Sequence, residues 1–170
     1  MNGANDLIGL VLVMLVGGAA LAALLVALVL LQPGVTGQCK IAIEKETRRS
    51  FWLGLVNLLF FLALAAFMMG ASATFVPWLQ AAMAVFAVAI VATLTMVALL
   101  GIGGMLQVLA ERMGKAPTPL VGLIRSAGLL VGAAVAPFVG WWLFAPVILI
   151  FGLGAGILVL FRPKKTVKTK

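Results

Sequence analysis

Residues able to do acid–base or metal chemistry are few in this chain and lie apart from one another. The four acidic residues are Asp6, Glu44, Glu46 and Glu111, and the chain has no histidine and no tyrosine. Without histidine, the usual axial haem ligand, the most common metal ligand and the usual proton carrier near neutral pH are missing. The acids lie between apolar runs or at their ends, so none is placed to carry a proton or sodium ion at mid-membrane. We therefore predict no catalytic residue, no metal site and no bound cofactor.

The lone cysteine, Cys39, has no partner for an internal disulfide. Its place in a predicted cytoplasmic loop favours a reduced, free thiol. Palmitoylation of a cysteine next to a membrane span stays open as an alternative.

Uncharged polar residues inside the apolar runs are also few. They are Asn57, Thr93 and Thr95, with Gln80 and Gln107 nearer the predicted ends. In membrane helices such side chains commonly hydrogen-bond between helices, each contact contributing about 1 kcal/mol or less. A polar path through the membrane would need more of them on one face.

Composition places these residues in an integral membrane protein. The chain is 65% hydrophobic and only 9% charged, and its mean hydropathy is +1.28. A globular domain is usually about a quarter charged, so this chain lacks the residues for a soluble surface. At 170 residues it has room for one membrane domain covering residues 1–170.

Long apolar runs predict the elements of that domain. A bilayer core of roughly 30 Å is crossed by about 20 helical residues. We expect an all-α helical bundle with five spans, at residues 7–31, 51–71, 78–109, 120–136 and 141–161. The third run is longer than a crossing needs, so either that helix tilts or the glycines near Gly101 end it.

The number of spans depends on the apolar region 120–161, which is about twice the length of one crossing. Pro137, Gly140 and the pair Trp141 and Trp142 lie at its middle and favour a helical hairpin there. The first arm of that hairpin is short. Four spans with a re-entrant final segment therefore remain an alternative.

The basic residues predict the orientation. All twelve fall in the segments 40–49, 112–125 and 162–170. Short loops rich in Lys and Arg stay in the cytoplasm, and five spans put all three segments on that side. The N-terminus is then outside, and residues 162–170 form a basic cytoplasmic tail of a multi-pass protein in the cell inner (cytoplasmic) membrane.

Small residues at four-residue spacing predict where helices pack. Gly128, Gly132 and Ala136 recur in the fourth predicted span, and Gly152 and Gly156 recur in the fifth. Such stripes let helix backbones approach closely in lipid. They suit either packing within the predicted hairpin or contact with a neighbouring subunit.

Basic side chains next to the spans predict lipid or partner contacts. Arg125 lies close enough to the inner end of the fourth predicted span for its guanidinium to reach the headgroups, and Arg162, Lys164 and Lys165 follow the last span. Glu44 and Arg48, at i,i+4 spacing beside Ile41, predict a short interfacial helix in the first basic segment. Membrane lipids are therefore the expected ligands, and a pigment stays open because chlorophyll-type pigments need not use histidine.

Four short motifs resemble the membrane region of some bacterial proteins allied to bactofilin-type, polymer-forming cytoskeletal proteins. They are Leu30-Leu31-Gln32-Pro33, Ser50-Phe51-Trp52-Leu53-Gly54-Leu55, Ala136-Pro137-Phe138-Val139-Gly140-Trp141 and Phe151-Gly152-Leu153-Gly154-Ala155. The resemblance implies a bacterial inner-membrane anchor or scaffold without enzymatic activity. Those proteins often carry a β-helical polymerising domain, which this chain lacks, so a direct filament role is not implied.

Two functions are compatible with these patterns. The first is a non-enzymatic scaffold or accessory subunit that packs laterally against other integral membrane subunits or against itself. The alternative is a small transporter or channel that uses Asn57, Thr93 or Thr95. No nucleic-acid partner is expected, because attraction to anionic lipid accounts for the net charge of +8.

Overall fold

The computed structural model describes residues 3–72, 77–114, 118–136 and 139–161, and these residues are almost entirely helical. In chain order the elements are α1 (Gly3–Leu31), α2 (Pro33–Lys45), α3 (Thr47–Ser72), α4 (Pro77–Arg112), α5 (Pro119–Val135), the π-helical turn η1 (Gly140–Phe144) and α6 (Ala145–Leu160). The predicted all-α class is confirmed.

Four described segments are long and apolar enough to cross a membrane. They are Ile8–Leu31, Thr47–Met68, Trp78–Arg112 and Gly140–Leu160. By length and composition they make this a multi-pass membrane protein. The predicted span 120–136 corresponds to α5, whose 17 residues extend about 26 Å, less than the roughly 30 Å of a bilayer core.

Several predicted boundaries agree with the helices, and others differ. α1 ends at Leu31, and Pro33 begins α2 at a position where its missing N–H costs no helical hydrogen bond. α4 continues through Gly101 without a break, so the glycines do not end it. Trp141 and Trp142 lie inside η1, the first turn of the last apolar segment.

A helix is present where a short interfacial helix was predicted, but it ends earlier than the charge spacing implied. α2 stops at Lys45 and α3 begins at Thr47, so Glu44 and Arg48 belong to different helices. Glu46, at the junction, instead pairs with Arg49, with 3.4 Å between Oε2 and Nη1. The charge pattern indicated a helix here, but not the break that redirects the chain into α3.

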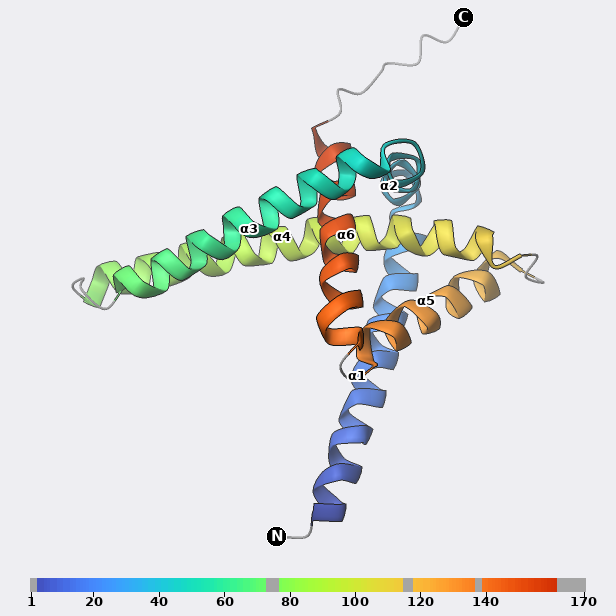
Figure 1. Ribbon diagram of the computed structural model, residues 1–170, viewed down its shortest axis with the longest axis horizontal. Helices are drawn as coiled ribbons and strands as arrows, with labels where there is room; N and C mark the ends of the chain where they lie inside the picture. Colours follow the sequence, from blue (N-terminus) through green and yellow to red (C-terminus); the bar gives the residue numbers. More distant parts are fainter. Residues whose placement is uncertain (1–2, 73–76, 115–117, 137–138, 162–170) are drawn as a thin grey trace, which may run out of the picture.

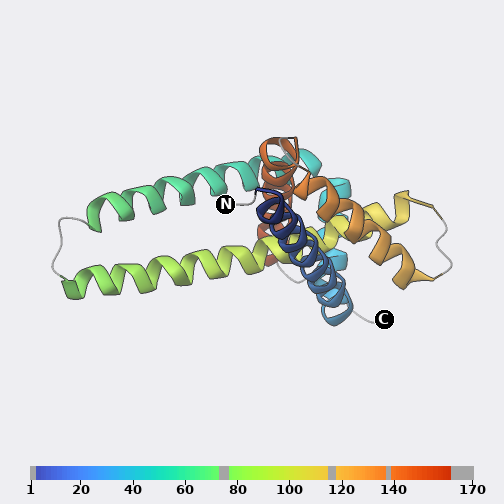
Figure 2. The ribbon, with the colours of Figure 1, turned by 90° about the horizontal axis from the view of Figure 1, so that it is seen from below.

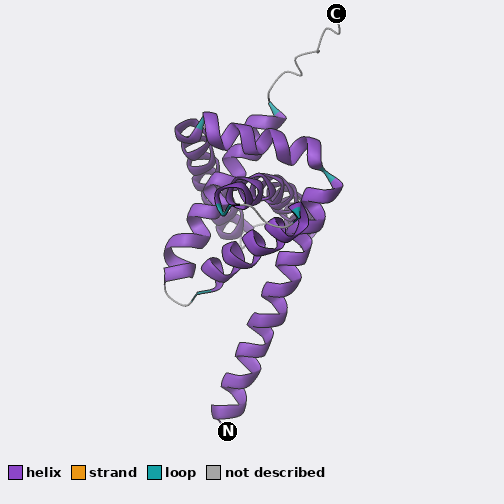
Figure 3. Ribbon diagram, turned by 90° about the vertical axis from the view of Figure 1, so that its right-hand side faces the viewer, coloured by secondary structure: helices purple, strands orange, loops and turns teal. Residues whose placement is uncertain are grey.

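The helices cross steeply, in contrast to the aligned packing of most membrane bundles. α3 and α4 run side by side along the long axis, and α6 and α1 run across them (Figure 1). In the view turned by 90°, α6 is seen nearly end-on while α3 and α4 still lie lengthwise (Figure 2). The N-terminal half of α1 extends away from the other helices (Figure 3).

α6 is wedged between α3 and α4, and glycines on two of its faces make this possible. Residues two apart on a helix point to nearly opposite sides. On the α3 side, a Cβ at Gly154 would overlap the carbonyl oxygen of Ser50. On the α4 side, a Cβ at Gly101 would overlap the Cα and carbonyl of Gly152. The α6 backbone therefore touches both neighbouring backbones.

A second packing centre joins α1, α4 and α5. Its buried side chains are Leu25, Val29, Ile102, Leu106, Leu123, Ala127 and Val131. These are ordinary aliphatic contacts, and they hold α5 against α1 and α4 at the end of α4 that lies beyond α6.

Adding one methyl group at Gly154 tests the wedge. Gly154→Ala should lower the free energy of unfolding of the full chain in mild detergent by about 1–3 kcal/mol, because the methyl group meets backbone that cannot yield cheaply. Gly128→Ala is the matched control, since a Cβ there meets nothing within 4 Å and alanine favours the helix. Equal unfolding midpoints for the two variants would contradict the close contact.

Candidate functional site

Polar side chains from different helices meet where α2 lies on α4 and α6. Thr36, Cys39 and Lys40 share one face of α2, and Gln107 and Glu111 are one turn apart on α4. We call these five residues the polar junction. The matched four-residue spacing on the two helices brings Thr36 to Gln107 and Lys40 to Glu111.

Two glycines of α4 let α2 approach this closely. A Cβ at Gly103 would lie 3.0 Å from the Thr36 methyl carbon, and one at Gly104 would lie 2.7 Å from the Cys39 Cβ. Thr36 and Cys39 are completely buried as a result. The packing thus depends on the glycine cluster that the sequence offered as one possible end of the helix.

The hydrogen bonds of the junction satisfy its buried polar groups. Thr36 Oγ1 donates to the Gln32 carbonyl at 2.8 Å and accepts from Gln107 Nε2 at 2.8 Å. Lys40 Nζ donates to Glu111 Oε1, and this ion pair is partly exposed to solvent. An exposed ion pair contributes little stability, about 0–1 kcal/mol, so the partly buried Thr36–Gln107 hydrogen bond is the stronger determinant of register.

α6 joins the same region through its backbone carbonyls. The Cys39 thiol points at the Ala155 carbonyl with 3.9 Å between Sγ and O, and Ser50 Oγ lies 3.4 Å from the Phe151 carbonyl. Both are long, weak contacts. Burial raises the pKa of the Cys39 thiol to about 11, so the group stays protonated and is a poor nucleophile.

The predicted packing residues fall in two different settings. Gly152 and Gly156 face α4, where Cβ atoms would press on Ile102 and Val97. The sequence had favoured packing within the α5–α6 hairpin, and these two glycines contact α4. At Gly128 and Gly132 a Cβ meets nothing within 4 Å; together with Ala136 they line an open apolar groove of about 570 Å³ beside α1.

Among the predicted lipid or partner contacts, Arg125 is exposed on α5. Arg162, Lys164 and Lys165, like the rest of the predicted tail, lie outside the described residues. Glu44 is exposed at the end of α2.

Three uncharged polar residues of the spans bond within their own helices. Asn57 donates to the Leu53 carbonyl, Thr93 to the Ala89 carbonyl and Thr95 to the Val91 carbonyl, each at 2.8 Å. These contacts satisfy the side chains locally, without bringing two helices together. In the described part of the chain, no three His, Cys, Asp or Glu side chains gather where they could hold a metal ion.

Sequence reasoning missed how the junction is assembled. Thr36, Lys40 and Glu111 were not singled out as a contact, and Gln107 was treated as an ordinary polar residue near a span end. The available signal was the pair of i,i+4 polar spacings on α2 and α4, together with Gly103 and Gly104 one turn before Gln107.

Compared with known proteins, the chain matches no family model, no curated protein and no solved structure.

The burial of Cys39 predicts its reactivity. A pKa of about 11 in place of the ordinary 9.0 lowers the thiolate fraction near neutral pH about a hundredfold, and the side chain has no exposed surface. A maleimide should therefore label the protein very slowly in mild detergent and rapidly after unfolding in SDS. Rapid labelling of the folded protein would contradict the structure.

The same shift makes stability depend on pH. The unfolded thiol releases its proton near pH 9.0 while the folded thiol holds it until about pH 11, so the free energy of unfolding should fall across that interval. Cys39→Ala is the control: without the thiol, its free energy of unfolding should not show this fall. Unfolding titrations at pH 8, 9 and 10 measure it.

Proposed function

We propose that this protein is a non-enzymatic scaffold or accessory subunit that packs laterally against other integral membrane proteins. The observation that carries the proposal is an apolar groove between α3 and α4. The groove lies beyond α6, in the part of the space between α3 and α4 that α6 does not fill.

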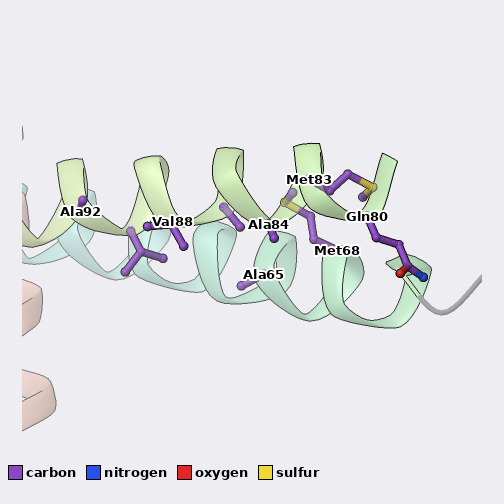
Figure 4. A pocket seen from close by; sticks show the side chains of 9 residues that line it. Ala65, Met68, Gln80, Met83, Ala84, Val88 and Ala92 are labelled. Carbon is purple, nitrogen blue, oxygen red and sulfur yellow. The ribbon is translucent and has the colours of Figure 1, made fainter. Parts of the chain in front are cut away.

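The groove has the size and lining expected for contact with a helix. It has a volume of about 500 Å³ and is lined by small and flexible side chains, among them Ala65 and Met68 of α3 and Ala84, Val88 and Ala92 of α4 (Figure 4). A second apolar hollow, sharing Ala65 and Val91 with the first, extends toward Leu149 and Leu153 of α6. Because α6 holds α3 and α4 apart by its own width, the space beyond it suits another slender helix.

The chemistry of the lining favours packing over transport. Alanines let a partner's backbone approach, and methionines adapt to its surface. The alternative of a transporter gains no support from Asn57, Thr93 and Thr95, because each donates to a carbonyl of its own helix. Integral membrane subunits, or a second copy of the chain, are the partners that this groove fits.

We also propose the orientation that places the three basic segments together in the cytoplasm, in a bacterial inner membrane. The Lys40–Glu111 ion pair joins the first segment to the end of α4. Cys39 and Ser50 contact carbonyls of α6, the helix that precedes the third segment. α1 and α6 also run in the same direction, both ending beside α2 (Figure 1). Five crossings, with α5 as the short fifth, are the number that puts all three basic segments on one side.

Filling the groove tests the scaffold. Ala84→Trp should abolish co-purification of membrane partners from mild detergent, because the indole occupies the space between α3 and α4. Ala82→Trp is the matched control, since Ala82 is exposed on the same helix outside the groove lining. The partners would be identified by mass spectrometry of the tagged full-length protein.

Two results would contradict the scaffold. One is purification of the wild-type protein as a lone monomer while cells lacking it keep their membrane complexes intact. The other is solute flux in proteoliposomes that is lost on changing Asn57, Thr93 or Thr95, which is the outcome expected of a transporter.

A reporter fused after Lys170 tests the orientation. With the basic segments held inside, a reporter active only in the cytoplasm should be active there, because Lys and Arg resist transfer across the membrane. A second fusion, within residues 115–117, should report the same side. An external signal at Lys170 would leave an even number of crossings.

A further inference from the structure

Beside the polar junction, a cavity of about 410 Å³ lies between the ends of α1, α4 and α5. Its lining includes Gln107, Glu111 and Thr118, together with Val29 and Leu123 from the α1–α4–α5 packing centre. The other grooves described above have at most one polar side chain in their linings. This cavity therefore combines polar and apolar side chains in its lining.

Each polar side chain that lines the cavity offers at least one hydrogen-bond acceptor. Gln107 gives one amide N–H to Thr36, and its carbonyl oxygen can accept from a ligand. Glu111 gives one carboxylate oxygen to Lys40 and keeps the other. The Thr118 hydroxyl accepts from the Val121 amide at 3.3 Å, as the N-cap of α5.

The end of α4 adds to this negative character. The helix ends at Arg112, and Gly114, with φ of +92°, turns the chain away. The last carbonyls of a helix have no partner within it and carry partial negative charge. A ligand that places a cationic donor at this point satisfies both the carbonyl dipoles and the carboxylate.

Two basic side chains belong to the surroundings of these acceptors. Lys40 is held on Glu111, and the exposed Arg125 lies one turn along α5 from Gly122, which lines the cavity. A ligand with an ammonium group next to a phosphate matches this alternation of charge. Its apolar remainder matches Val29 and Leu123.

We propose that this cavity binds the headgroup of a phospholipid bearing a primary amine, with the ammonium donating to Gln107 and Glu111 and the phosphate facing the basic side chains. The site is independent of the α3–α4 groove, so it stands whether or not the protein is a scaffold. It would attach the cytoplasmic ends of α1, α4 and α5 to one lipid.

Native mass spectrometry of the full-length protein in mild detergent tests the site, with phosphatidylethanolamine, phosphatidylcholine or phosphatidylglycerol added in turn. We expect the ethanolamine lipid to be retained about tenfold better than the choline lipid, whose quaternary nitrogen keeps the charge but has no N–H to donate. Equal retention of these two lipids would overturn the proposal, as would tighter binding of phosphatidylglycerol.

Two variants separate the carboxylate from its ion pair. Glu111→Gln should remove most of the preference for the ethanolamine lipid, whereas Lys40→Gln, which breaks the same ion pair but leaves the carboxylate, should keep it. Retained preference in Glu111→Gln would overturn the proposal. If Glu111→Gln fails to fold, the comparison of the ethanolamine and choline lipids on the wild-type protein still tests the proposal.

Soluble phosphoethanolamine separates a lipid site from a site for any small amine. Added at millimolar concentration, it should raise the unfolding temperature far less than the lipid does, because it lacks the apolar part that meets Val29 and Leu123. An equal rise would show that the lipid portion is not recognised and would overturn the assignment to a membrane lipid.

Discussion

The rest of the structure depends on the direct backbone contact of α6 with α3 and α4. In a membrane, burial of apolar side chains gives little net drive for helices to associate, so close van der Waals packing and hydrogen bonds must supply it. Glycines meet at each crossing: Gly54 and Gly154 on the α3 side, and Gly101 and Gly152 on the α4 side. These contacts fix the separation of α3 and α4 on either side of α6, and that separation leaves the groove beyond α6.

The helical class and the long apolar segments could be predicted because each follows from local composition and length. The helix crossings could not, because whether a glycine meets another backbone depends on which helix arrives and at what angle. Gly128 and Gly132 have the spacing of a packing stripe and border an open groove, while Gly54 and Gly101, outside any stripe singled out, lie at the tightest contacts. The spacing of small residues identifies helix faces that permit close approach, and the helix that packs there determines which face is used.

The polar groups show a similar division. Asn57, Thr93 and Thr95 each reach a carbonyl one turn back, which any helix provides, so their contacts depend only on local structure. Thr36 and Gln107 are 71 residues apart and meet because Gly103 and Gly104 remove the side chains that would separate α2 from α4. The polar junction is thus a tertiary feature, and it sets the α4 end beside α2, where a carboxylate faces a cavity.

The position of α6 has a consequence for biosynthesis. The chain emerges from the ribosome in order, so α3 and α4 enter the bilayer long before the helix that separates them. Until α6 arrives, lipid chains or another protein must occupy the gap, or the two helices must close on each other through Gly54 and Gly101. Insertion of α6 then requires that occupant to leave or the two helices to separate. Completion of the fold is therefore a late step in which α6 replaces an earlier contact of α3 and α4.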